Sequence, residues 1–144
     1  MRLPSFQLYL TYLAFLSGVD CLRGDWPQFR GPDGQGHSDQ TGIPIHWKEG
    51  ENITWKTAVP GRGWSSPVIA GNQVWMTSAE VDGKSLHAIC IDKRSGKLLH
   101  NVEVLTPQDA GPHHRLNGYA SPTPVLDGER VYTHFGPRGS VCLD

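Results

Sequence analysis

The chain has 144 residues, with 13 Lys and Arg against 14 Asp and Glu, so its formal net charge is −1. Because the charges are balanced and no run of basic residues occurs, neither nucleic acid nor an anionic membrane surface is supported as a partner. The 17 glycines and 11 prolines stand mostly between short apolar runs. This punctuation predicts an all-β protein with many turns rather than a disordered chain.

Residues 1–24 have the layout of a secretory signal peptide. Arg2 precedes the nearly uncharged run Leu8–Leu16, and the small residues Ser17 and Gly18 follow it. The run is short for a transmembrane helix, so we expect an exported, periplasmic or extracellular protein with no membrane span in the mature chain. A buried amphipathic helix is the alternative. A lipid anchor on Cys21 is disfavoured, because no small residue directly precedes this cysteine.

Residues 25–60 predict an irregular lead-in followed by a first strand. No periodic pattern runs to Thr41, and we expect the aromatic side chains of Trp26 and Phe29 to pin this part. The alternation of β-branched or aromatic with polar residues over Ile53–Val59 predicts a strand. Pro60–Gly63 then indicates a turn.

Residues 61–144 predict two repeated units. Strands are expected at 66–69, 74–78, 86–91 and 98–104, and then at 121–126, 130–134 and 140–143. The pattern of Pro67–Trp75 returns as Pro124–Tyr132, and that of Ala88–Asp92 returns as Ser140–Asp144. Short-stranded repeats of this kind predict stacked units, most often propeller blades.

We therefore expect a partial β-propeller of four-stranded antiparallel blades, about one and a half to two of them, with the second repeat truncated. The remaining blades are expected in a longer parent chain. Blade faces and strand edges without neighbours predict that the isolated segment aggregates, associates or folds only in part.

Two sets of side chains are expected in the blade cores. The aromatic set is predicted to fill the space between blades rather than to stack on a ligand, and it comprises Trp64, Trp75, Tyr119 and Tyr132. Cys90 and Cys142 occupy the same repeat position, and we expect both as free, buried thiols. A disulfide between them is the disfavoured alternative.

Several segments, in order, resemble bacterial proteins with pyrroloquinoline-quinone-like β-propeller repeats. They are Asp25–Pro32, Trp55–Thr57, Trp64–Val68, Asn117–Pro124 and Asp127–Gly136. In that family an apolar strand ends in Asp and is followed by a Thr/Ser-Gly-Lys turn and a strand that carries Trp. Here Ile91–Leu99 follows the pattern but His100 stands at the Trp position, which suggests a degenerate or terminal repeat.

The resemblance implies an extracytoplasmic propeller, and some such proteins are scaffolds without known chemistry. The quinone-dependent dehydrogenases of the family hold their cofactor on Ca²⁺ beside a ring formed by two adjacent cysteines, a pair that this chain lacks. We therefore favour a binding or scaffolding role, for an unidentified protein or small-molecule ligand, over an enzyme. The alternatives are the amino-terminal part of a quinone-dependent dehydrogenase and an enzyme of other chemistry that carries the propeller as a recognition domain.

No segment of the sequence predicts a catalytic, cofactor-binding or metal-binding residue. Asp33–Asp39 is rich in oxygen ligands, but its spacing does not match an EF-hand and fits Gly-rich turns better. His113 and His114 could bind a metal from a loop, although side chains that satisfy backbone groups are the simpler reading. No nucleophile elbow surrounds Ser65-Ser66 or Ser121. No cofactor is expected.

Overall fold

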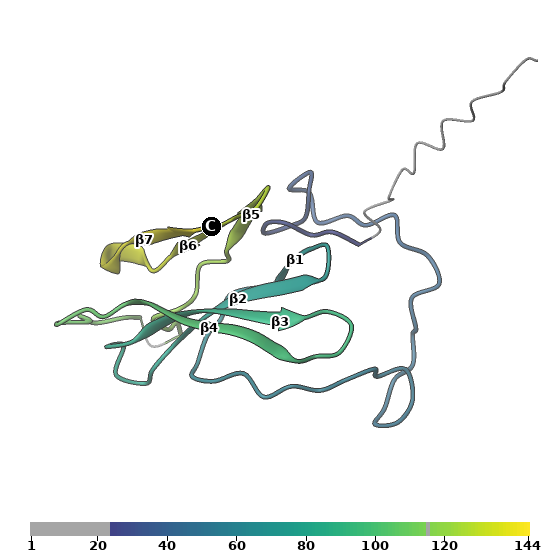
Figure 1. Cartoon of the computed structure of the whole chain (residues 1–144), viewed down its shortest axis with the longest axis horizontal. Helices are drawn as coiled ribbons and strands as arrows, with labels where there is room; N and C mark the ends of the chain where they lie inside the picture. The colour runs from purple at the N-terminus through teal and green to yellow at the C-terminus, as the bar shows by residue number, and fades with distance from the viewer. Residues whose placement is uncertain (1–23, 115) are drawn as a thin grey trace, which may run out of the picture.

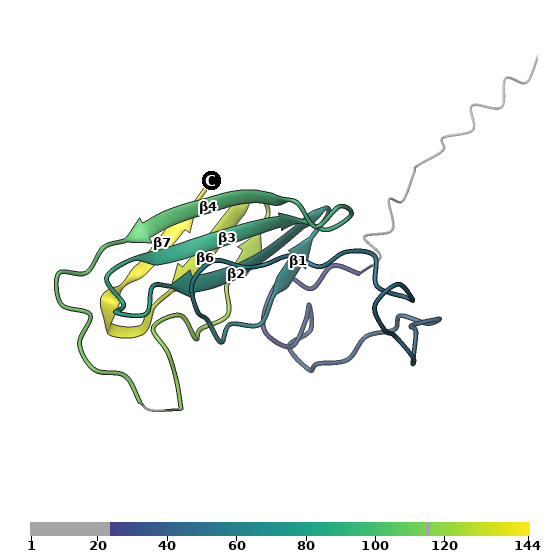
Figure 2. The ribbon, with the colours of Figure 1, turned by 90° about the horizontal axis from the view of Figure 1, so that it is seen from below.

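The computed structural model describes residues 24–114 and 116–144, so the predicted signal peptide lies almost entirely outside the described residues. The fold is all-β: two antiparallel sheets stack on each other, as Figures 1 and 2 show. One 3-10 turn, Gly136–Arg138, precedes the last strand. None of the helices in the described part has the length and apolar character needed to span a bilayer.

The first sheet is a meander in the order β1-β2-β3-β4. Its strands are β1 (Val68–Ala70), β2 (Gln73–Ala79), β3 (Leu86–Asp92) and β4 (Leu98–Leu105). The second sheet has the order β5-β6-β7 and consists of β5 (Val125–Asp127), β6 (Arg130–His134) and β7 (Ser140–Leu143). A strand is present at each of the seven positions predicted between residues 66 and 143, and the seven strands form two antiparallel sheets.

The first strand of each unit begins later than predicted. β1 starts after Pro67 and β5 starts after Pro124, since a proline has no N–H to donate to the ladder. At Ser66 the backbone N–H is satisfied by the other unit instead, because it donates to Thr123 Oγ1 at 3.1 Å. The two proline-containing segments therefore run beside each other, outside the ladders.

The main core lies between the two sheets. Sheet 1 contributes Val68, Trp75, Ala88 and Cys90 to this cluster, and sheet 2 contributes Leu126 and Val131. Trp75 is only 7% exposed, which confirms the prediction for this aromatic, and His100 stacks on its ring at a centroid distance of 5.9 Å. A second cluster joins Ala79 and Leu86 to Ala120 and Phe135.

The other face of sheet 1 is covered by the segment predicted as a first strand. The prediction of a strand over Ile53–Val59 was wrong, because this segment pairs with no strand. It runs along the face of sheet 1 opposite to sheet 2 (Figure 1). The side chains on one side of this alternating segment bond to the β3–β4 turn instead. Trp55 Nε1 donates to Lys93 O at 2.8 Å, and Thr57 Oγ1 donates to Gly96 O.

The lead-in also joins the two sheets at their first strands. Trp26 exchanges two backbone hydrogen bonds of 2.8 and 2.9 Å with Ile69 of β1, and Leu126 N of β5 donates to Pro27 O at 2.8 Å. The backbone of Trp26 therefore holds this segment to β1, and its ring packs against Gly31, where an added Cβ would lie 2.8 Å from the ring. Phe29 does not pin the segment, because its side chain is 60% exposed.

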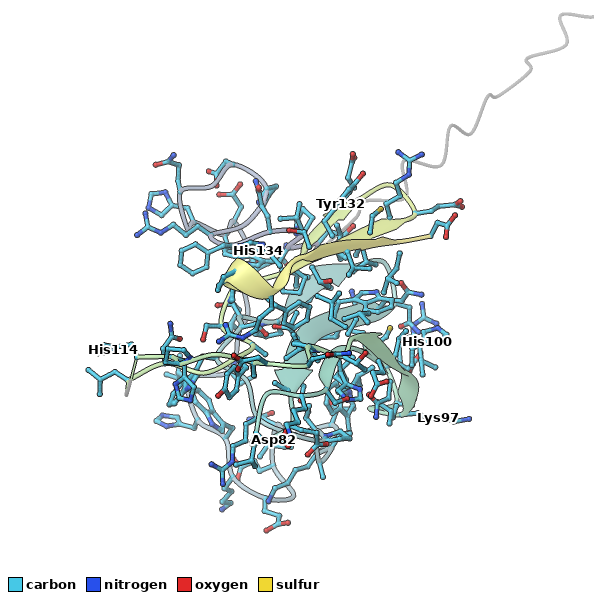
Figure 3. The ribbon with its side chains drawn as sticks, turned by 90° about the vertical axis from the view of Figure 1, so that its left-hand side faces the viewer. Asp82, Lys97, His100, His114, Tyr132 and His134 are labelled. Atoms are coloured by element: carbon cyan, nitrogen blue, oxygen red, sulfur yellow. The ribbon has the colours of Figure 1, made fainter. Side chains whose placement is uncertain are left out.

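The outward face of sheet 2 differs from the predicted core. Tyr132 is 37% exposed, and Figure 3 shows it on the side of sheet 2 that faces away from sheet 1. Cys142, the partner of Tyr132 across the β6–β7 ladder, is exposed, whereas Cys90 is buried. The expectation of two buried thiols was thus wrong for Cys142. Burial raises the pKa of the Cys90 thiol to about 11, with a further contribution from Asp92.

Candidate functional site

A cavity of about 630 Å³ lies at the end of β2. Its volume falls within the range of about 300–1,000 Å³ that is typical of small-molecule pockets. The segment from Val59 to Ser65 forms one wall, and side chains of the long loop before β5 form the other. The side chains that matter chemically are Arg62, Trp64, Glu80, His113, Asn117 and Tyr119.

The first wall was predicted as a turn at Pro60–Gly63. The chain does bend at Pro60 and Gly61, where Gly61 has a φ of +76°, but from Arg62 on it pairs with β2. Arg62 and Ala79 exchange two backbone hydrogen bonds of 2.8 Å, which extends the pairing along β2 beyond β1. Trp64 N donates to Ala120 O at 2.8 Å, so the same strip is also fixed to the second unit. The strip is therefore held on both sides by backbone hydrogen bonds.

The glycines of this strip explain its alternating sequence. A Cβ added to Gly61 would lie 2.7 Å from Ala79 O, and one added to Gly63 would collide with Thr77 O. Residues with side chains cannot approach β2 this closely. Between residues 61 and 64 the side chains are consequently those of Arg62 and Trp64, and both residues line the cavity.

Trp64 is not between the blades as predicted, because its side chain is 72% exposed. Its indole edge lies against Gly118, where an added Cβ would be 3.1 Å from Trp64 Cδ1. The backbone hydrogen bond to Ala120 and this edge contact position the indole from two sides. The rest of the ring is open to the cavity.

Tyr119 forms the opposite wall and is held by its neighbours. Its hydroxyl donates to Gly111 O at 3.2 Å, and the Arg138 guanidinium lies 4.6 Å from its ring centroid. The His113 ring meets it edge-on at 4.6 Å. Gly83 lies directly against the ring, since an added Cβ would approach it to 2.7 Å. This wall is therefore a packed cluster rather than a loose loop.

The two adjacent histidines do not converge on one point. His113 lines the cavity, whereas His114 lies at the far end of its loop in Figure 3. Leu116 N donates to His114 Nδ1 at 3.2 Å and Asn117 N donates to His114 O at 2.8 Å. The expectation that this loop uses a histidine to satisfy backbone groups is confirmed for His114.

The oxygen-rich segment and the serines form local hydrogen bonds. Asp33 Oδ1 accepts from Gln35 N at 2.9 Å, within a series of Gly turns. Ser65 Oγ accepts from Thr77 N at 3.0 Å, which gives this N–H of β2 a partner at a point where β1 has not yet begun. Ser121 Oγ bonds to Asn117 Oδ1. Over residues 24–114 and 116–144, no group of three or more His, Cys, Asp or Glu side chains is arranged to hold a metal.

One polar cluster was missed from the sequence. Ser85 Oγ lies 2.6 Å from His87 Nε2 and also donates to Glu103, which faces His87 across the β3–β4 ladder. His87 Nδ1 is buried without a hydrogen-bond partner. In a Ser-His-acid relay the carboxylate bonds to the second histidine nitrogen, whereas here it bonds to the serine. The order of contacts therefore does not match that relay.

The charges of the cavity are balanced. Arg62 and Glu80, which carry opposite charges, both line it. Among the described residues an ion pair forms between Lys48 and Glu51, which lie outside the cavity, and not between Arg62 and Glu80. Both polar side chains therefore remain free to bind a ligand.

Comparison of the chain with models of known protein families, with curated proteins and with solved structures finds no match. What the chain does is therefore inferred from its own residues.

Proposed function

We propose that the chain is part of an exported β-propeller repeat protein of the pyrroloquinoline-quinone-like type, with a binding or scaffolding role. The observation that carries the proposal is the way in which the two sheets repeat. Val68 pairs with Trp75, and Trp75 pairs with Cys90. Val125 pairs with Tyr132, and Tyr132 pairs with Cys142, in the same manner.

These equivalent sets lie on equivalent faces. The Val68, Trp75 and Cys90 face of sheet 1 is covered by Leu126 and Val131 of sheet 2. The matching face of sheet 2, with Tyr132 and Cys142, points outward. The sheets thus stack head to tail rather than face to face. A head-to-tail contact repeated with a constant rotation forms a ring when that rotation closes and an open array when it does not. Propellers are rings of such sheets.

The lead-in supports a place at the beginning of the array. It covers the face of sheet 1 that holds Val74, Ile89 and Ile91, with Trp55 packed against them. A terminal repeat needs such a cover, because each unit otherwise exposes one apolar face.

A binding role is favoured over catalysis because the cavity combines an exposed aromatic ring with polar side chains. The polar cluster at Ser85, His87 and Glu103 lacks the contact order of a nucleophilic relay. Export is inferred from the apolar run Leu8–Leu16 that follows Arg2.

The experimental structure of the full natural chain tests the architecture. Four-stranded blades arranged radially, with Tyr132 and Cys142 covered by a following blade, are expected. A two-sheet sandwich whose Tyr132 face stays open would contradict the proposal.

The alternative, a quinone-dependent dehydrogenase, is tested by titrating the same protein with pyrroloquinoline quinone and Ca²⁺, followed by absorbance and calorimetry. We expect no saturable binding. Micromolar or tighter binding of the quinone would favour the dehydrogenase instead.

A further inference from the structure

The cavity at the end of β2 presents a flat aromatic surface to solvent. Trp64 is 72% exposed, yet its backbone is hydrogen bonded to Ala120 and its edge lies against Gly118. An exposed tryptophan that is positioned in this way loses little conformational freedom when a ligand stacks on it. The negative face of an indole attracts groups with partial positive charge, including the C–H face of a sugar ring.

The polar side chains around the indole suit hydroxyl groups. Arg62, Glu80 and Asn117 line the same cavity, and each ends in a planar group with two or more hydrogen-bonding atoms. A guanidinium or an amide can donate to hydroxyl oxygens, and a carboxylate can accept from two neighbouring hydroxyls. Vicinal hydroxyls of a sugar match both kinds of group.

The charge balance of the cavity selects against ionic ligands. Arg62 and Glu80 carry opposite charges and line the same space, so an ionic ligand gains little net attraction there and still loses its hydration. The preferred ligand is therefore polar but uncharged. A volume of about 630 Å³ leaves room for a ligand of one or a few sugar rings.

We infer that this cavity binds a neutral carbohydrate, with one sugar ring stacked on Trp64 and its hydroxyls bonded by Arg62, Glu80 and Asn117. The inference rests on the proposed binding function and names its ligand class. It goes beyond the propeller architecture, because the cavity lies between the segment before β1, the end of β2 and the loop before β5, and not between the stacked sheets.

The test uses the full natural chain and neutral trisaccharides of glucose, xylose, mannose and N-acetylglucosamine, with a uronic-acid trisaccharide and adenosine as comparison ligands. Binding is followed by saturation-transfer NMR and by calorimetry. We expect at least one trisaccharide to bind saturably, with a Kd of about 1 mM or lower. Trp64→Ala is expected to weaken this binding at least about tenfold, because it removes the stacking surface.

Trp47→Ala is the matched control, since Trp47 is also strongly exposed, at 67%, but does not line the cavity. It should leave binding unchanged. Circular dichroism and thermal melting establish that both variants fold. Trp64→Phe, which keeps a smaller aromatic surface, should retain part of the affinity.

Three results would overturn the inference: no binding of any neutral trisaccharide by the folded protein, binding that survives Trp64→Ala, or binding only of a uronic-acid trisaccharide or of adenosine. The architecture is judged separately, from the experimental structure. A radial propeller that binds no neutral sugar would refute the carbohydrate inference alone, whereas Trp64-dependent sugar binding by a non-propeller fold would refute the architecture alone.

Discussion

The Trp55 indole lies so close to Gly96 that a Cβ added to this glycine would be 2.5 Å from the ring. Gly96 also has a φ of +72°, in the left-handed region. Two separate constraints therefore act on one position of the β3–β4 turn. Because Trp55 comes from the lead-in, this contact fixes the cover of sheet 1 to the sheet itself.

Gly96→Ala is expected to lower the free energy of unfolding by at least about 2 kcal/mol, because the left-handed backbone and the clash both add cost. Gly128→Ala is the matched control. Gly128 has a φ of +59° but nothing within 4 Å of its added Cβ, so it should cost only about 1 kcal/mol. Urea denaturation measures both values.

A double-mutant cycle isolates the contact with Trp55. In a Trp55→Ala background the clash is absent, so Gly96→Ala should cost no more than Gly128→Ala does. Equal costs of Gly96→Ala in both backgrounds would show that the indole does not constrain this glycine.

The carboxylate of Asp92 organises the same turn and makes its stability depend on pH. Its Oδ1 accepts from Ser95 Oγ at 2.6 Å, from Ser95 N at 2.7 Å and from Arg94 N at 3.2 Å. The hydrogen bond from the Ser95 hydroxyl is the largest cause that lowers the pKa of Asp92 below its usual 3.8. The ionised form is therefore favoured in the folded protein.

A carboxyl whose pKa is lowered on folding contributes stability above its unfolded pKa and loses it as the pH falls through its folded pKa. Asp92 thus stabilises the fold at neutral pH. This contribution declines as the pH falls below about 3.8 and is lost as the pH passes the lower pKa of the folded state. Asp92→Asn should reduce the difference in unfolding free energy between pH 6 and pH 2.5. Asp127→Asn, at the β5–β6 turn, is the control and should change that difference less. An equal effect of the two substitutions would contradict this role of Asp92.

The strand order could be predicted because local signals suffice for it. Short apolar runs, separated by turn residues such as Gly71 and Gly128, specify the hairpins of both sheets. The alternation around Trp55 was misread, since a period of two reports which side chains share a face and not whether the backbone has a partner strand.

The cavity could not be predicted in the same way. The glycines at 61 and 63 look like turn formers in the sequence, and only the course of β2 shows that they allow close approach. Trp64 and Trp75 are the same residue type, and both were expected between the blades. Their opposite exposure depends on Leu126 and Val131, which cover Trp75 and are distant in the sequence.

The two thiols of the sheets should react differently. Cys142 is exposed, whereas Cys90 is buried and its pKa is raised to about 11, so little thiolate forms at pH 8. Iodoacetamide added at pH 8 to the folded isolated segment of residues 24–144, diluted until it is monomeric, should alkylate Cys142 and spare Cys90 until denaturant is added. Mass spectrometry of the peptides measures both sites. Equal labelling in the native protein would mean that Cys90 is accessible.

Export predicts a defined amino terminus. When the natural gene is expressed in a bacterial host, the signal peptide should be removed and the mature chain should begin between about Asp20 and Trp26. Intact-mass measurement of the periplasmic protein determines the start. Met1 retained on a soluble cytoplasmic product would contradict the export proposal.

The outward face of sheet 2 should mediate association of the isolated segment that comprises residues 24–144. Val125 and Tyr132 are partly exposed there, whereas their equivalents Val68 and Trp75 are buried between the sheets. Exposed apolar surface of this kind favours association over a monomer. Light scattering coupled to size-exclusion chromatography, under reducing conditions, should therefore show species larger than a monomer.

Tyr132→Glu should shift this equilibrium toward the monomer, because association would bury its carboxylate without a partner. Ile45→Glu is the control: Ile45 is at least as exposed but lies in the lead-in, outside the stacked sheets, and its change should leave association intact. If the unmodified segment is a monodisperse monomer with one sharp thermal transition, the Tyr132 face needs no cover. In that case head-to-tail stacking ends at sheet 2, and the propeller proposal loses its main support.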